Sequence, residues 1–502
     1  MKILMIYPQC PDTFWSFSYA LKFISKKAVH PPLGLMTVAA MLPREWDKKL
    51  VDMNTQKLND KDLMWADYVF LSAMSIQKES VRNVINRCRS MGIKVVAGGP
   101  LFTNEREDFA DVDHLVLNEA EITLPLFLND IRDGQPRHIY TSDKWADITT
   151  TPVPLWELIN PKHYASMNIQ YSRGCPFECE FCNITTLYGR VPRTKNSQQV
   201  IGELEKLYEL GWRGGVFFVD DNFIGNKKKL KEEILPSIIG WMEMKKHPFN
   251  LSTEASINLA DDEDLMRMMA RAEFSTVFVG IESPHEESLL ECTKIPNKNR
   301  DLIASVRKLQ SFGLEVQAGF IVGFDKDPVS IFERMIKFIQ ESGIVTAMVG
   351  LLNAPRGTKL HDRLVSENRL LKTSTGDNTD FSMNFIPKMN YDKLISGYKK
   401  IIDTIYSPKH YHARVKQFLR EYRPVQKNVI HMRYSYLKAA FKSVFILGII
   451  GKERFYYWRI FFWSLFRRPK LFPLAITFSI YGFHFRKVFE DHFRMIERKD
   501  TL

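Results

Sequence analysis

The sequence predicts an α/β protein with two successive strand–helix regions followed by a helical C-terminal region. Three observations support this. Short apolar runs alternate with helical stretches over residues 1–145, a strand-then-helix pattern repeats six times over residues 166–365, and the composition changes over residues 366–502. Alternation of strand and helix is typical of parallel sheets. The 502 residues, 45% hydrophobic and 25% charged, are enough for two or three globular domains.

Residues 1–145 predict a doubly wound, Rossmann-like sheet. We expect its strands at residues 3–7, 49–51, 68–72, 94–97 and 114–117, with helices at 35–42 and 79–90. The first strand does not have the pattern of a signal peptide. Ligands of such sheets bind beyond the carboxyl ends of the strands, which makes the loop of residues 72–77 and the turn Gly98-Gly99-Pro100 candidate sites. Glycine there lets a ligand approach the backbone.

A turn-rich linker is expected over residues 146–165, where Pro152 and Pro154 favour extended chain. After it, strands are predicted at residues 168–171, 215–219, 250–253, 276–281, 315–322 and 347–352. Polar side chains follow three of these strands: Asp220, Asp221 and Asn222, then Glu254, then Glu282. Residues that do chemistry in α/β barrels gather at such strand ends. Solvated turns or helix N-caps would explain the same acids without function.

Cys175, Cys179 and Cys182 form a CxxxCxxC loop. Three thiolates at this spacing can hold a 4Fe–4S cluster and leave one iron without a protein ligand. Zinc and buried free thiols are the alternatives, although no second cysteine pair completes a zinc site. Cys10, Cys88 and Cys292 are scattered and fit small buried side chains. So few cysteines and an oxygen-labile cluster indicate a reducing cytoplasm.

The cysteine loop, with Phe181 before its last cysteine, resembles the radical S-adenosylmethionine (SAM) family. The resemblance implies that the second region is a partial (β/α)6 radical SAM barrel and that SAM binds the open iron through its amine and carboxylate. It also implies roles for residues around SAM. These are Asp220, Asp221 and Asn222 at the amino group, Glu254 and Glu282 at the ribose, and Phe181, Gly319 and Gly323 at the adenine.

The N-terminal loops resemble those of the cobalamin-binding domain, which carries a serine after its third strand and Gly-Gly after its fourth. Ser72, Gly98 and Gly99 match, and the resemblance extends the predicted cobalamin site to Met74, Gln77 and Pro100. Asn54 and Lys57 replace the histidine and glycine of the family's DxHxxG motif, so cobalamin would bind without a histidine below the cobalt. An empty Rossmann-like docking domain is the alternative.

The C-terminal region is basic and aromatic. Residues 401–502 hold 20 Lys and Arg against 7 Asp and Glu, which accounts for the whole positive excess of the chain. No uncharged run reaches the ~20 residues of a membrane-spanning helix. Bulky aromatics between basic residues favour peripheral contact with the inner face of the membrane. A helical cap on the barrel is the alternative, and nucleic acid fits less well because the apolar residues are too aliphatic and too dense.

Stretches at residues 30–35, 65–70, 172–182, 188–195 and 217–226 are similar to the radical SAM subgroup that includes the hopanoid C-2 methylases. This implies cobalamin-dependent methyl transfer to an unactivated carbon of a lipid or isoprenoid, with a reductant such as flavodoxin or ferredoxin. No general acid or base is needed, so His361, His410 and His484 are given structural roles. Two alternatives stay open: ring or C–C bond formation in a lipid without methyl transfer, and a non-catalytic, membrane-associated Fe–S accessory protein.

Overall fold

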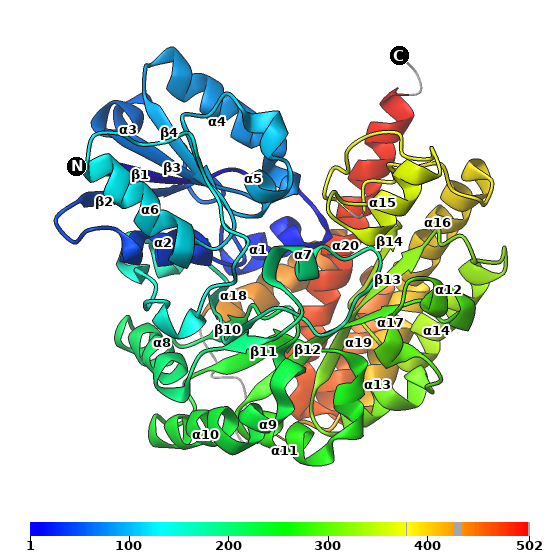
Figure 1. The fold of residues 1–502 in the computed structure, drawn as a ribbon. Coiled ribbons are helices and arrows are strands. Elements are labelled where there is room, and N and C mark those ends of the chain that lie inside the picture. Colours follow the sequence, from blue (N-terminus) through cyan, green and yellow to red (C-terminus); the bar gives the residue numbers. More distant parts are fainter. Residues whose placement is uncertain (378, 426–433, 500–502) are drawn as a thin grey trace.

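The computed structural model describes residues 1–377, 379–425 and 434–499. It contains two six-stranded sheets and a region of C-terminal helices that lies against the second sheet (Figure 1). All strand pairs within both large sheets are parallel. The predicted α/β class is therefore confirmed, and the helical C-terminal region with it. The domain limits at residues 145, 165 and 365 stay predictions.

The first sheet has the order β2-β1-β3-β4-β5-β6. Its strands are β1 (Lys2–Tyr7), β2 (Asp47–Asp52), β3 (Tyr68–Ser72), β4 (Lys94–Gly98), β5 (His114–Val116) and β6 (Ile139–Tyr140). Four successive residues of β1, Ile3 to Ile6, are fully buried, as expected of a parallel strand covered on both faces. The strand order reverses between β1 and β3, which is where doubly wound sheets bind ligands. β6 was not predicted, because its two residues carry no strand pattern.

Helices of the first region are α1 (Ser18–Ile24), α2 (Leu33–Met41), α3 (Asp60–Trp65), α4 (Lys78–Ser90), α5 (Pro100–Asn104) and α6 (Ala120–Arg132). The predicted linker is not merely extended chain. It contains short 3-10 turns at Trp156–Leu158 and Pro161–His163, and Trp156 is completely buried in the core shared with the second sheet. This segment therefore joins the two regions by packing as well as by connectivity.

The second sheet runs β14-β13-β12-β11-β10-β7, so strands that follow one another in the chain are neighbours. Its strands are β7 (Ser166–Ile169), β10 (Gly215–Phe218), β11 (Asn250–Glu254), β12 (Phe274–Glu282), β13 (Glu315–Val322) and β14 (Ala347–Leu351). All six predicted strands are present, within two residues at each end. The main helices between them are α8 (Ser197–Glu209), α10 (Leu235–Met244), α11 (Glu263–Arg271), α13 (Leu302–Ser311) and α14 (Ile331–Ser342).

The C-terminal region consists of α15 (Lys359–Ser366), α16 (Tyr391–Ile405), α17 (Pro408–Glu421), α18 (Tyr434–Ser443), the π-helical segment η11 (Val444–Ile450), α19 (Arg454–Arg467) and α20 (Phe472–Lys499). It also fixes the loop after β1. The rings of Phe14 and Phe485 stack at 4.2 Å, and His484 on α20 is buried with its Nε2 3.0 Å from the carbonyl of Phe14. Among the described residues, no helix is long and apolar enough to cross a membrane.

A glycine at the contact between α14 and α16 gives a stability prediction. A Cβ at Gly397 would collide with the ring of Phe332, so Gly397→Ala should destabilise the protein by about 1–3 kcal/mol through overpacking. Gly240 in α10 has open space at the same atom, and Gly240→Ala should instead stabilise by about 0.5–1 kcal/mol. The midpoints of urea unfolding, followed by far-ultraviolet circular dichroism, test both. Equal shifts in the two variants would contradict this packing.

Candidate active site

The polar residues predicted from the sequence gather at the carboxyl edge of the second sheet. The cysteine loop follows β7 and the two-residue strand β8 (Ser172–Arg173), which pairs with β9 (Arg193–Thr194). Asp220, Asp221 and Asn222 follow β10, and Glu254 and Glu282 are the last residues of β11 and β12. Gly323 follows β13, whereas Gly319 lies in the middle of that strand, paired with Gly280. The ring of Phe181 lies 6.3 Å from that of Phe324, next to Gly323.

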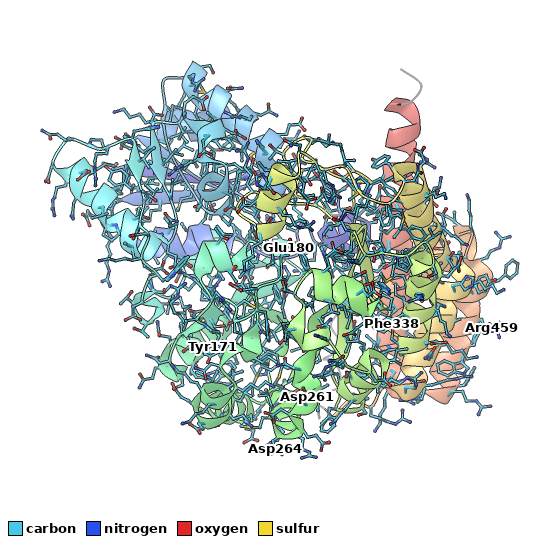
Figure 2. The ribbon with its side chains drawn as sticks, turned by 45° about the vertical axis from the view of Figure 1, so that its right-hand side comes forward. Tyr171, Glu180, Asp261, Asp264, Phe338 and Arg459 are labelled. Atoms are coloured by element: carbon cyan, nitrogen blue, oxygen red, sulfur yellow. The ribbon has the colours of Figure 1, made fainter. Side chains whose placement is uncertain are left out.

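Backbone hydrogen bonds hold the cysteine loop in place. The Cys175 amide donates to the Gly189 carbonyl at 3.3 Å, and the Cys182 amide donates to the Cys179 carbonyl at 3.0 Å. Gly174 has a φ of +92°, and a Cβ there would lie 2.9 Å from the Gly189 oxygen, so only glycine fits. The carboxylate of Glu180 forms an ion pair with Arg363 of α15 at 2.6 Å. Glu180 lies beside α15 in Figure 2.

The surroundings of the three thiols fit a cluster bound by thiolates. Each cysteine is free and half-buried. Burial raises the pKa of all three, that of Cys182 to about 12, whereas the nearby Lys294 ammonium lowers each pKa. An ammonium beside thiols favours the thiolate, which is the form that ligates metal. Among the described residues, no three His, Cys, Asp or Glu side chains meet at a point suited to one metal ion. A cluster does not require such a point, because each of its irons takes its own thiolate.

Asp220 and Asn222 use their side chains to brace loops. Asp220 is fully buried, and its carboxylate accepts hydrogen bonds from the amide of Tyr171 at 3.1 Å and from the amide and hydroxyl of Ser172. The amide oxygen of Asn222 accepts from the Ser256 amide and hydroxyl at 3.2 and 3.3 Å. This geometry differs from the expectation that the side chains of Asp220 and Asn222 face SAM. Burial is the reason, because buried acceptors must find donors in the protein.

Two acids at this edge, Asp221 and Glu254, accept at most one hydrogen bond each and form no ion pair among the described residues. Asp221 accepts one hydrogen bond, from the Gly174 amide at 3.3 Å, and burial raises its pKa to about 6. Burial also raises the pKa of Glu254 to about 8, and the charges of Asp221 and Asp220 push it in the same direction. Within the described residues, no hydrogen bond engages the Glu254 carboxylate. A bound cation would therefore relieve an unfavourable cluster of negative charge.

Glu282 adopts a strained conformation that an ion pair helps to hold. Its φ is +63°, rare for a residue with a side chain, and the register of β12 against β13 shifts at this point. Its carboxylate lies 2.6 Å from Nζ of Lys294. A Cβ at Gly280 would come 2.7 Å from the same Nζ, so this glycine makes room for the pair. The sequence did not single out Lys294, because a lone lysine far from the cysteines in the chain carries no motif.

The first sheet offers a glycine-lined surface at its carboxyl edge. Gly99 has a φ of +90°, and a Cβ there would lie 2.5 Å from Oγ of Ser72; a Cβ at Gly98 would lie 2.5 Å from the Val116 oxygen. Met74 is exposed, and Pro100 begins α5. Neither of these two positions can therefore carry a side chain. This cradle is the feature of the chain that fits the predicted cobalamin site.

Two amide side chains brace the loops around this cradle. Gln77 is buried, donates to the Pro8 carbonyl at 2.6 Å and accepts from the Met74 amide at 2.9 Å. Asn54 accepts from the Cys10 amide at 2.8 Å and donates to Asp52 at 2.7 Å. Gln77 thus connects the loop after β3 to the loop after β1. Asn54, at the position of the cobalt-ligating histidine in the classical motif, is likewise held, by Cys10 of the loop after β1 and by Asp52, the last residue of β2.

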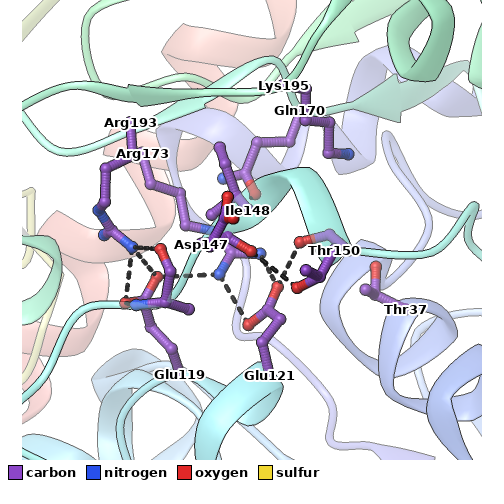
Figure 3. Close-up of polar contacts among 12 residues, drawn as sticks. Thr37, Glu119, Glu121, Asp147, Ile148, Thr150, Gln170, Arg173, Arg193 and Lys195 are labelled. Atoms are coloured by element: carbon purple, nitrogen blue, oxygen red, sulfur yellow. Dashed lines mark hydrogen bonds and ion pairs between the residues drawn. The ribbon is translucent and has the colours of Figure 1, made fainter.

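An ion network that the sequence did not predict connects the two regions (Figure 3). Arg173, two residues before Cys175, lies 3.0 Å from Glu119 and 2.7 Å from Glu121 at the start of α6. Arg193 lies 2.8 Å from Glu119 as well. The side chains of Glu119 and Glu121 are only 1% and 5% exposed. Only the Arg-Gly-Cys order beside the cysteine loop could have drawn attention to Arg173.

The loop after β1 also reaches the second sheet. The indole N–H of Trp15 donates to Sδ of Met348 at 3.0 Å, and its ring meets that of Phe278 edge-on at 5.4 Å. Phe278 pairs in register with Glu254, and Gly319 pairs with Met348. Residues paired in register lie on the same face of a sheet. An apolar group of Trp15, Phe278 and Met348 therefore stands on the face of the sheet that carries Glu254.

Comparisons with known proteins agree with this arrangement. The B12 binding domain matches residues 23–128, the Radical SAM superfamily matches residues 169–339, and a domain of unknown function (DUF4070) matches residues 358–498. An uncharacterized methyltransferase of Synechocystis is 40% identical over 97% of this chain and 91% of its own length. The hopanoid C-2 methylase of Rhodopseudomonas palustris is 34% identical over 81% of this chain and 77% of its own length.

The chain belongs to the cobalamin-binding radical SAM family. It is an enzyme of the methyltransferase type, and its cofactors are a 4Fe–4S cluster, SAM and cobalamin. Solved structures share the fold. The cobalamin-dependent radical enzyme OxsB has a TM-score of 0.63 at 13% identity, covering 99% of this chain and 80% of its own. The methyltransferase TsrM of Kitasatospora setae has a TM-score of 0.61 at 13% identity, covering 84% of this chain and 99% of its own.

The ion network gives a prediction about the cluster. Arg173→Met would leave two buried carboxylates without this partner, which should cost about 3–5 kcal/mol and loosen the cysteine loop. We expect the iron content after reconstitution and the rate of 5′-deoxyadenosine formation both to fall at least tenfold. Arg137→Met, which removes an exposed pair with Asp130, should change neither. Full cluster content in Arg173→Met would show that the network does not support the loop.

The raised pKa of Glu254 gives a pH prediction for the cluster-free protein. A carboxyl with a pKa of about 8 in the folded state and its ordinary value near 4.5 in the unfolded state binds its proton more tightly when folded. Stability therefore falls as the pH rises from 5 to 8, by on the order of 3 kcal/mol. Glu254→Gln should make this fall smaller, leaving the part due to Asp221, whereas Glu287→Gln, at an exposed position in the first turn of α12 (Glu286–Glu291), should leave it unchanged. Melting temperatures across this pH range test it; parallel curves for Glu254→Gln and wild type would contradict it.

Proposed function

We propose that this chain methylates an unactivated carbon of a lipid or isoprenoid substrate, hopanoid-like in character. The observation that carries the substrate class is the apolar group of Trp15, Phe278 and Met348 beside Glu254. A substrate without polar groups must be positioned by apolar contacts, which such side chains supply. The similarity to a hopanoid C-2 methylase extends over 81% of the chain and supports the same class.

In this proposal the protein binds and orients its cofactors. Cys175, Cys179 and Cys182 hold the cluster, and Lys294 stabilises their thiolate form. Asp221 and Glu254 face the ammonium and ribose of SAM, with Glu282 nearby, and Phe181, Gly319 and Gly323 lie at the adenine. Asp220 and Asn222 hold the loops behind these groups. When bound, the cluster, SAM and cobalamin supply the radical and methyl-transfer chemistry.

Cobalamin lies on the cradle of Gly98 and Gly99 in this proposal, with Ser72, Met74 and Pro100 around it and Gln77 beneath. Cobalamin would bind here without a histidine ligand, because Asn54 stands at that position and its side chain is held by Cys10 and Asp52. Reducing power comes from a flavodoxin or ferredoxin. The basic C-terminal region contacts the inner face of the membrane, where an apolar substrate is found.

Anaerobic reconstitution tests the proposal. With cobalamin, SAM and a reductant, the enzyme should hold about four iron atoms per chain and form 5′-deoxyadenosine. With SAM deuterated at its methyl group and an isoprenoid lipid extract in detergent, a lipid product should gain one deuterated methyl group by mass spectrometry. Cys179→Ala should lower SAM cleavage at least about a thousandfold, whereas Cys88→Ala, buried in the first region, should retain it.

Two other results would change the assignment. SAM cleavage with a lipid product that has gained a bond but no methyl group would indicate a ring-forming or C–C bond-forming enzyme. No SAM cleavage by cluster-replete protein, with the lipid extract present, would indicate an accessory Fe–S protein.

A further inference from the structure

Three successive elements of the C-terminal region expose two apolar rows. On α18 and η11 the row contains Phe441, Phe445 and Ile449, which are 78%, 54% and 56% exposed and lie four residues apart. On α19 it contains Phe455, Phe462 and Phe466, which are 75%, 49% and 76% exposed. Spacings of four and seven place residues on one side of a helix. These six residues are called the aromatic face below.

The opposite sides of the same elements are already buried. Leu447, Tyr457 and Ile460 are at most 2% exposed, and Leu447 and Tyr457 pack with Phe23 of α1 and Ile480 of α20. The indole N–H of Trp458 donates to the Gly448 carbonyl at 2.9 Å, which joins α19 to η11. Packing within the chain therefore accounts for one side of these helices. It does not account for the aromatic face, although large apolar side chains usually gather in exposed patches only where a partner covers them.

Unpaired positive charge accompanies this face. Residues 437–475 contain eight Lys and Arg and a single acid, Glu453, which is buried and paired with Arg486 at 2.6 Å. Within the part of the chain that the structure describes, no ion pair joins any of those eight to a carboxylate. Arg459 lies on α19 between Phe455 and Phe462 and points away from the body of the molecule in Figure 2. The face is therefore apolar and cationic together.

We propose that the aromatic face docks onto the surface of an anionic phospholipid bilayer. Helices that lie in a membrane interface insert an apolar side among the acyl chains and set Lys and Arg against anionic headgroups. The aromatic face has both features, and its positive charge complements such a surface. The choice of a membrane, in preference to an acidic protein, rests on the mixture of isoleucine and phenylalanine, which suits acyl chains. The biological purpose, access to a lipid substrate, rests on the proposed function.

Flotation of the full-length protein with lipid vesicles tests the proposal. The wild type should float with vesicles of phosphatidylcholine containing about 30% phosphatidylglycerol, and not with phosphatidylcholine alone. Phe441→Ser/Phe455→Ser/Phe466→Ser should weaken binding at least about thirtyfold. Arg459→Glu/Arg467→Glu should weaken it at least about tenfold, and high salt should weaken the wild type similarly. A control, Met64→Ser/Met244→Ser/Val329→Ser, changes residues that are 67%, 73% and 63% exposed elsewhere, and should bind as the wild type does.

Several outcomes would overturn the proposal: no flotation of the wild type, equal flotation with neutral vesicles, or unchanged flotation of the triple phenylalanine variant. A wild-type dimer in light scattering that this variant converts to a monomer would also overturn it, because the face would then bind a second copy. Iron content and SAM cleavage in the same samples show that each variant is folded; if the triple variant misfolds, the charge variant decides. Methyl transfer in detergent without vesicle binding would refute docking alone, and vesicle binding without a methylated product would refute the proposed function alone.

Discussion

The buried ion network of Arg173, Arg193, Glu119 and Glu121 is the constraint on which the arrangement of the site depends. One sheet carries the cysteine loop and the other carries the glycine cradle, and this network spans the boundary between them. Each buried carboxylate needs its guanidinium, because a buried charge without a partner is strongly unfavourable. The relative position of loop and cradle is therefore fixed by charge pairing as well as by the core around Trp156.

Most polar residues near the site support loops and leave few groups for ligands. Asp220, Asn222, Gln77 and Asn54 all direct their side chains to nearby backbone or hydroxyl groups. Such bracing holds a site in place before a ligand arrives, which is what a reaction between several bound cofactors requires. We propose that the thiols, Asp221, Glu254 and the bare backbone at Gly99 are the places where the chain meets its cofactors.

The C-terminal helices combine two roles that their composition alone does not separate. α20 fixes the loop after β1 through Phe485 and His484, and that loop carries Trp15 to the second sheet. α18, η11 and α19 bury one side against α1 and α20 and expose the other. The helical cap that the sequence left as an alternative is thus present, but it leaves Phe441, Phe445, Phe455, Phe462 and Phe466 exposed. The aromatic side chains that remain exposed belong to the basic, aromatic stretches from which contact with lipid was predicted.

The sequence by itself determined the two parallel sheets and the family, because strand periodicity and the CxxxCxxC loop are local patterns. For this reason, the strand predicted at residues 315–322 has the same first and last residues as β13. Only the tertiary structure decided which protein groups engage the acids at the carboxyl edge of the second sheet. Asp220 and Asp221 are adjacent in the chain, yet Asp220 accepts from Ser172 and Asp221 accepts from the Gly174 amide. The partners differ because they depend on what packs against each side chain. The pairings of Lys294 with Glu282 and of Arg173 with Glu119 likewise join residues that no local pattern connects.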